Sequence, residues 1–225
     1  MTVNEAVRRR RSIRAFLPTP VSEATLREVL DAARWAPSGS NIQAWKVVAV
    51  AGEERDAIVR MALEAMGTPS MTSNDDFPIY PPNLWEPLRT RRFALAEDMY
   101  RALGIPREDK AARLRQLARN TELFGAPVGL FFCLDRKLGP PQWSDVGMYM
   151  QTVMLLAVEQ GLDTCAQEYW ARYPRTVADL LGLPDDHMLF SGMALGWRDE
   201  SAPINTLRSA RDPFEAWGEL RGFEG

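Results

Sequence analysis

Apolar and polar residues alternate along this chain with two different periods, and the period of each block predicts its secondary structure. The box Thr2-Val3-Asn4-Glu5 predicts a helix that begins at Thr2 and runs to about Arg10. Ser22 caps a second helix, which ends before Pro37. Helical spacing predicts further helices over residues 53–66, 144–160 and 176–181. Apolar and β-branched runs predict strands at 45–50, 128–134, 162–167 and 188–195. The helix at 144–160 is apolar almost all round, so we expect it to be buried.

Residues 67–118, called the excursion below, have a different character. Tyr80, Trp85 and small polar residues stand there among prolines at positions 69, 78, 81, 82 and 87. Two charged helices are predicted, over 88–103 and 109–123. Because the excursion has no strand of its own, we predict one domain over residues 1–225 with a long insertion, of the kind that forms lids or binding surfaces. The tail from Pro203 is polar, with Trp217 and Phe223 as isolated anchors, and is predicted to drape over another surface.

Helices outnumber strands and separate them, so the fold class is α+β, or α/β, with a central sheet. The formal net charge of the 225 residues is −3, which argues against bulk binding to nucleic acid or to an anionic membrane. We find neither a secretory leader nor an apolar stretch of membrane-spanning length. Cys133 and Cys165 each lie in an apolar run, so two buried free thiols in a cytoplasmic protein are expected.

Several common chemistries are excluded by missing motifs. The sequence has no Walker A loop, no G-x-G-x-x-G and no G-x-S-x-G. The single histidine, His187, rules out a histidine-rich metal site and is better interpreted as a loop residue than as a catalytic base. We therefore predict no metal and assign no catalytic side chain. Such a chain is expected to obtain its chemistry from a cofactor.

Two motifs offer groups that could bind one. Arg10-Arg11-Ser12-Ile13-Arg14 places guanidinium forks and a hydroxyl within a short stretch, as phosphate binding requires. A solvated basic patch at a helix C-terminus explains it equally well. The segment 36–45, Ala-Pro-Ser-Gly-Ser-Asn-Ile-Gln-Ala-Trp, offers amides and hydroxyls to a polar ring edge, although a plain turn would use the same residues.

Together these motifs carry a resemblance to a known family. R-x-S-x-R-x-F, followed by P-S-G-x-N-x-Q-x-W, resembles the FMN-binding nitroreductases. The resemblance continues in Arg119-Asn120, in Phe124-Gly125-Ala126-Pro127, in the segments 161–170 and 196–197, in Asn205 and in Arg211-Asp212-Pro213. It covers nearly the whole chain, and the order of the blocks makes it specific.

The resemblance implies an α+β sandwich in which helices flank a central, mostly antiparallel sheet, and a homodimer whose sites lie at the interface. It implies FMN as cofactor and NADH or NADPH as electron donor. Arg10, Ser12 and Arg14, joined by Arg11, would meet the phosphate, ribityl chain and pyrimidine edge, and Arg211, with Arg208, would close on the phosphate. Pro37, Ser38, Ser40 and Asn41 would reach the flavin from the partner subunit. The remaining cofactor residues would lie along the flavin edges: Asn120, Gln167 and Glu168.

The sequence departs from the family's pattern at two positions. Tyr169 stands where a glycine is common, and Leu123 falls near the register of a lysine. Arg14 or Arg119 would then supply the positive charge near flavin N1 and O2. Tyr80, Trp85 and Arg119 are the candidate acceptor-binding residues, although Tyr80 and Trp85 could equally serve only to pack the excursion on the core.

The implied activity is ping-pong transfer of electrons from NAD(P)H to nitroaromatic or quinone-like acceptors. Two alternatives stay open. One is a reductive dehalogenase or an ene or quinone reductase on the same scaffold. The other is a flavin-binding protein without turnover. The physiological acceptor and the preference between NADH and NADPH stay open as well.

Overall fold

The computed structural model describes residues 1–68 and 76–223. Pro69, one of the prolines of the excursion, lies outside the described residues. Four antiparallel strands form one sheet in the order β1-β2-β4-β3: β1 Lys46–Ala51, β2 Val128–Asp135, β3 Asp163–Gln167 and β4 His187–Gly196. Each lies within about one residue of a predicted strand. His187, expected in a loop, is instead the first residue of β4, where its ring pairs with Asp186.

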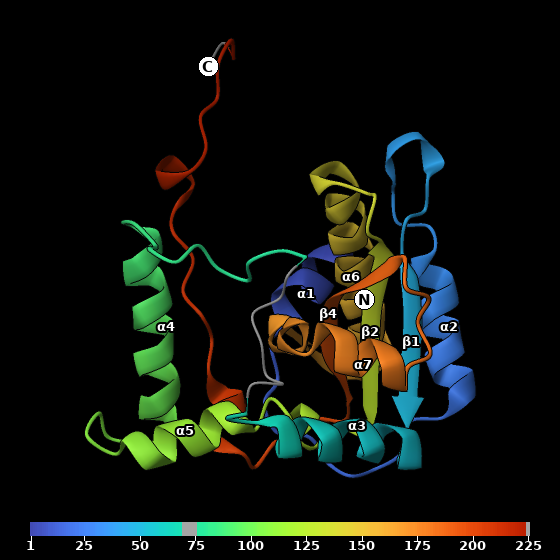
Figure 1. Cartoon of the computed structure of the whole chain (residues 1–225). Coiled ribbons are helices and arrows are strands. Elements are labelled where there is room, and N and C mark those ends of the chain that lie inside the picture. Colours follow the sequence, from blue (N-terminus) through green and yellow to red (C-terminus); the bar gives the residue numbers. More distant parts are fainter. Residues whose placement is uncertain (69–75, 224–225) are drawn as a thin grey trace.

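Helices cover both faces of the sheet, so the predicted α+β sandwich is confirmed (Figure 1). One core layer joins the sheet to α2 (Glu23–Ala33) and α6 (Pro140–Glu159). The other joins it to α3 (Gly52–Ala65), α7 (Pro174–Leu180) and the short 3-10 helix η3 (Glu168–Arg172). The capping box at Thr2 is present, and α1 runs over Val3–Arg9.

Helix α6 differs from its prediction in two ways. It begins at Pro140 rather than near Ser144, because prolines fit the first turn of a helix, where their missing N–H leaves no hydrogen bond unmade. It is also not buried all round, since Asp145, Tyr149 and Val153 face the core while Gly147 and Met148 are exposed. The expectation of a fully buried helix is therefore wrong for the single chain.

The predicted helix 109–123 is wrong at its C-terminal end. Helix α5 (Lys110–Ala118) stops, and a 3-10 turn, η2 (Leu123–Gly125), follows. Leu123 and Phe124 have φ values of 51° and 55°, in the left-handed region, and both side chains are buried. Burying these two apolar side chains requires a bend that an α-helix cannot make.

The helical part of the excursion, residues 88–118, and the end of the tail stand away from the sheet (Figure 1), whereas Phe77 packs against Phe190 of β4. Helix α4 (Leu88–Ala102) runs beside the chain that follows η4 (Pro203–Thr206), and Arg91 forms an ion pair with Asp212. Around the last short 3-10 helix, η5 (Phe214–Ala216), the tail projects from the body, and Trp217 and Phe223 are exposed. Trp217 contacts only its own segment among the described residues, through the Phe214 ring and the Asp212 carbonyl. Within the described residues, no helix has the length and apolar character needed to cross a membrane. Cys133 and Cys165 are free and buried, as expected.

Candidate functional site

The segment after α1 is held against the edge of the sheet. Ser12 forms a parallel bridge with Thr164 of β3, and the Ile13 amide donates to the Thr164 carbonyl at 3.0 Å. Ile13 is buried in the core, and because side chains alternate along extended chain, Ser12 and Arg14 point to the other side. The Ser12 hydroxyl lies next to the Cys165 thiol, whose pKa is raised by burial.

Guanidinium groups from the two ends of the chain meet at this segment. Arg10 lies near Arg211, and burial together with that neighbouring cation lowers the pKa of Arg10. Arg11 lies near Arg198 and Arg208, and burial first, then these two cations, lowers its pKa as well. Like charges repel one another, so this arrangement raises the energy of the protein unless an anion lies between them.

Few acceptors within the protein offset these charges. Arg11 Nη1 donates to the Asn205 carbonyl at 3.0 Å, but its Nε is buried without a hydrogen-bond partner. Arg208 and Arg211 donate to backbone carbonyls and, for Arg211, to the Ser209 hydroxyl. In residues 1–68 and 76–223, none of the arginines 10, 11, 208 and 211 forms an ion pair with a carboxylate. The cluster therefore fits a ligand with a multiply charged phosphate.

Asn205 holds this segment in place and was not among the predicted site residues. Its side-chain oxygen accepts from the Arg14 amide at 2.9 Å, and its nitrogen donates to the carbonyls of Ala15 and Asp199. It is buried, with a relative exposure of 5%. Its position in a block that resembles the family was the one signal for it, and no spacing tied it to Arg14.

The predicted flavin-edge residues also meet. The Gln167 side chain, at the end of β3, donates to the backbone and side-chain oxygens of Asn120 at 2.9 and 3.2 Å. Gln167 in turn accepts from the indole of Trp170 at 3.2 Å. This joins β3 to the turn after α5 and places Gln167 and Asn120 side by side, although they are far apart in the sequence.

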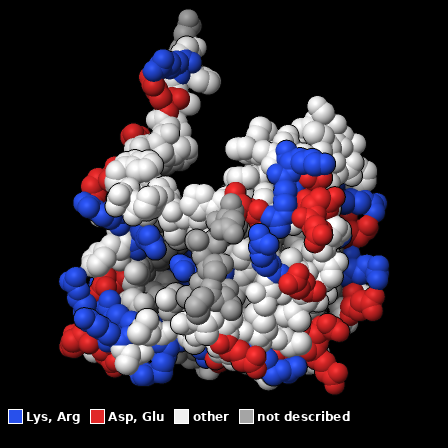
Figure 2. Space-filling view, in the orientation of Figure 1, with Lys and Arg blue, Asp and Glu red and all other residues white. Residues whose placement is uncertain are grey.

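The candidate acceptor-binding residues are only partly brought together. The Tyr80 hydroxyl lies beside the Glu168 carboxylate, and burial together with that negative charge raises the pKa of Tyr80. Trp85 is 60% exposed. Among the described residues its side chain forms no hydrogen bond and no ring contact with a predicted site residue. Arg119 forms an ion pair with Glu122 at 3.0 Å. Figure 2 shows the surface hollowed between α4 and the body of the protein, with arginine or lysine atoms visible inside the hollow.

The Pro37–Asn41 loop lies elsewhere. In Figure 1 it forms the light-blue loop above β1, well apart from α1 and the segment that follows it. Its Gly39 amide donates to both oxygens of Asp145, a buried carboxylate on α6, at 3.2 and 3.3 Å. Ser40 and Asn41 have φ values of 50° and 57°, which only a well-anchored loop maintains. One chain therefore does not bring Ser38, Ser40 or Asn41 to Arg10.

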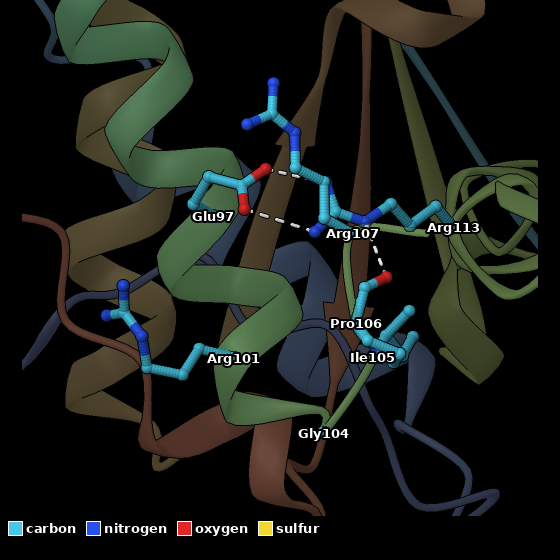
Figure 3. Close-up of a pocket in the computed structure, with 7 residues that line it drawn as sticks. All are labelled: Glu97, Arg101, Gly104, Ile105, Pro106, Arg107 and Arg113. Atoms are coloured by element: carbon cyan, nitrogen blue, oxygen red, sulfur yellow. Dashed lines mark hydrogen bonds and ion pairs between the residues drawn. The ribbon is translucent and has the colours of Figure 1, made fainter. Parts of the chain in front are cut away.

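Two hollows outside this site contain none of the predicted residues. One, of about 1130 Å³, lies along β1 and α2 and is lined by Leu26, Trp45 and Tyr149 among others. The other, of about 320 Å³, lies at the corner between α4 and α5 (Figure 3). There Arg113 donates two hydrogen bonds to the Glu97 carboxylate, of 2.6 and 3.1 Å, and the two charges neutralise each other. Among the residues with described placement, no group of acidic, histidine and cysteine side chains could hold a metal ion.

Comparison with known proteins identifies the family of this chain. The chain is 38% identical to the nitrobenzene nitroreductase of Ectopseudomonas oleovorans, over 95% of this chain and 94% of that protein. It is also 38% identical to the 4-nitrobenzoate reductase of Pseudomonas putida, over 96% and 93%. Its fold matches the crystal structure of the FMN- and NADPH-dependent nitroreductase NfnB of Sphigopyxis sp. strain HMH, with a TM-score of 0.95, 44% identity and coverage of 99% and 100%. Because the sequence model of the Nitroreductase family also matches residues 7–197, the chain belongs to the nitroreductase family.

Proposed function

We propose that this protein is an FMN-dependent oxidoreductase that transfers electrons from NADH or NADPH to nitroaromatic or quinone-like acceptors in a ping-pong cycle. The observation that carries the proposal is a cluster of four arginines beside Ser12: Arg10, Arg11, Arg208 and Arg211. Among the described residues none of the four forms an ion pair with a carboxylate, and the charges of Asp163 and Glu200 act on Arg11 only after those of the nearby arginines. A terminal monophosphate suits such a cluster. The activities of the similar proteins support the same reaction.

The residues fit the cofactor. Arg10, Arg11, Ser12, Arg208 and Arg211 would hold its phosphate, and the buried Nε of Arg11 still has a hydrogen bond to give. Asn120, Gln167 and Glu168 would line its edges. When bound, the flavin would supply the two-electron chemistry that couples hydride loss from the nicotinamide to reduction of the acceptor. In the first reduction, two electrons and two protons convert a nitro group to a nitroso group and water.

Arg14 is the residue that we assign to electrostatic stabilisation. Its amide is fixed by Asn205, and its guanidinium donates to the Ser12 carbonyl at 3.3 Å. A fixed cation stabilises negative charge that develops nearby, and it does so more strongly where water is excluded. Arg119 is the weaker candidate for this role, because Glu122 already neutralises it. We assign no side-chain acid or base.

We further propose that the functional unit is a homodimer working in the cytoplasm. The Pro37–Asn41 loop is held on α6 by Asp145 and stands apart from α1 in Figure 1, so the same loop of a partner subunit would complete the site. Apolar groups of Val3, Val7 and Met148 are exposed on α1 and α6 and would be covered. The projecting tail would lie on the partner. Sedimentation that shows an active, FMN-loaded monomer would contradict the homodimer.

The excursion, within a single domain of residues 1–225, would roof the slot for a small aromatic acceptor. Tyr80 supports this role because it lies next to Glu168. Trp85 and Arg119 would then meet the acceptor from the same side. Nothing in this proposal involves nucleic acid or a membrane.

Anaerobic mixing with NADPH or NADH tests the function. We expect purified protein to carry FMN, to lose its yellow colour on mixing, and to regain it when a nitroaromatic compound is added. A protein that keeps its colour would instead be a flavin-binding protein without turnover. Reoxidation by haloaromatic compounds or enones, but not by nitroaromatics or quinones, would favour the dehalogenase or ene-reductase alternative. Colourless protein that cannot be reconstituted with FMN would overturn all three.

A further inference from the structure

Two arginines from different elements converge on Tyr80 in the proposed roof. We infer that Arg92 and Arg172 recognise an anionic group on the ligand in this slot, either the carboxylate of an aromatic acceptor or a phosphate of the dinucleotide donor. The inference rests on the proposed function and adds to it a ligand class, since a nitroaromatic acceptor need not be charged.

The two cations lie over two different aromatic rings, Tyr80 and Tyr169, which Glu168 links. The Arg92 guanidinium carbon lies 4.3 Å from the centroid of the Tyr80 ring. Arg172 lies 6.0 Å from the ring centroid of Tyr169, the residue after Glu168, and its charge also acts on Tyr80. Glu168 touches Tyr80 from η3. The pair is thus linked through Tyr80 and Glu168 to the edge formed by Gln167 and Asn120.

Arg92 stands out among the arginines of α4. Arg89 pairs with Glu86 at 2.7 Å, Arg101 pairs with Asp98 at 2.6 Å, and Arg91 pairs with Asp212. Among the described residues, Arg92 has no carboxylate partner, and neither has Arg172. Helix α4 therefore pairs its other three arginines with carboxylates and leaves Arg92, the one that lies over Tyr80, without such a partner among the described residues.

The chemistry of the pair favours an anion on an aromatic body. A guanidinium stacked on a ring keeps its N–H edge free, and that edge matches the two oxygens of a carboxylate or phosphate. Arg92 and Arg172 bring two positive charges and Glu168 brings one negative charge, so these three residues together have a net positive charge. The exposed Tyr80 ring offers a face for stacking.

Matched acceptors separate charge recognition from general activity. We would measure kcat/KM for 4-nitrobenzoate and for nitrobenzene with the holoenzyme and with the variants Arg92→Gln, Arg172→Gln and Arg101→Gln. Arg101 is the control, because it lies on the same helix but is already paired with Asp98. We expect Arg92→Gln and Arg172→Gln each to lower kcat/KM for 4-nitrobenzoate by about fivefold, as an exposed ion pair allows, and to change nitrobenzene less than twofold. Arg101→Gln should change neither.

The two sources of the anion are distinguished by the donor. If Arg92 and Arg172 bind the dinucleotide, the variants will slow flavin reduction by NADPH. The ratio of kcat/KM for 4-nitrobenzoate to kcat/KM for nitrobenzene will then stay constant. Calorimetric titration with benzoate and its neutral analogue benzamide gives a readout besides turnover. We expect benzoate alone to bind more weakly to Arg92→Gln. The inference would be overturned if the wild-type protein reduces nitrobenzene while the variants leave acceptor selectivity, flavin reduction by NADPH and benzoate binding unchanged. The proposed function would then still stand. Wild-type protein that reduces neither acceptor would overturn both.

Discussion

The side-chain amide of Gln167 donates to both oxygens of Asn120, at 2.9 and 3.2 Å, and so ties the end of β3 to the turn that follows α5. This contact is the point where the sheet meets the base of the excursion. It also joins two residues that we propose to lie along the flavin. The contact should therefore matter both for stability and for cofactor binding.

Gln167→Leu tests this contact. Gln167 is buried, and the change leaves the Asn120 oxygens and the Trp170 indole without a partner, so we expect the free energy of unfolding to fall by roughly 2–3 kcal/mol. FMN affinity should fall as well. Chemical denaturation and fluorescence titration with FMN measure the two effects. Gln160→Leu is the control, since the Gln160 side chain, among the described residues, forms a hydrogen bond only with the exposed Glu28. Equal losses in both variants would mean that the contact has no special role.

Asp145 is expected to position the Pro37–Asn41 loop. Asp145→Asn keeps an acceptor for the Gly39 amide, whereas Asp145→Leu removes it and allows the strained Ser40 and Asn41 to relax. We expect Asp145→Leu to cost about 1–3 kcal/mol of stability. It should also weaken FMN binding, and Asp145→Asn should lose much less in both measurements. If the two variants bind FMN equally well, the carboxylate does not position a cofactor loop.

Arg211→Ala is expected to weaken FMN binding more than it changes the reactivity of bound flavin. A charge-assisted phosphate contact contributes about 1.5–3 kcal/mol, or roughly tenfold to a hundredfold in affinity. Activity should therefore return in excess FMN. Arg221→Ala, in the same tail but paired with Glu219, is the matched control. Lower activity per bound flavin at unchanged affinity would contradict the phosphate role.

The stability of the protein should fall at high pH because of Cys133. Burial raises the pKa of this thiol to about 12, whereas in the unfolded chain it is about 8.5. Between these values the unfolded state releases a proton that the folded state keeps, so the free energy of unfolding decreases as the pH rises. At pH 10, relative to pH 7, we expect Cys133→Val to lose about 2 kcal/mol less stability than the wild-type protein, because the buried Cys165 thiol contributes to the loss in both. Denaturation at both pH values measures the difference.

Thiol titration provides an independent check on the same residue. The native protein should not react with a thiol reagent at pH 8, since both cysteines are buried and protonated. Two thiols should react after denaturation. Fast reaction of the native protein would contradict the buried placement.

The local elements could be predicted from the sequence because their causes are local. The capping box at Thr2, the β-branched runs and the prolines around the excursion each act within a few residues, and the structure has α1 and the four strands near their predicted positions. The motif at Arg10–Arg14 could be recognised for the same reason. The errors occurred where distant packing decides: the burial of Leu123 and Phe124 ends α5 early, and the exposed side of α6 depends on what lies opposite it.

The site itself required the tertiary structure. No periodicity in the sequence indicates that Arg10 meets Arg211, that Asn205 holds Arg14, or that Arg92 stacks on Tyr80. The order of the strands and the path of the tail decide the first two contacts, because they bring together the two ends of the chain, and the fold of the excursion decides the third. The amino-acid sequence thus determined the elements and the family, through local backbone preferences and ordered motifs. The free energy of packing those elements together decided which charges converge and which of them keep no partner.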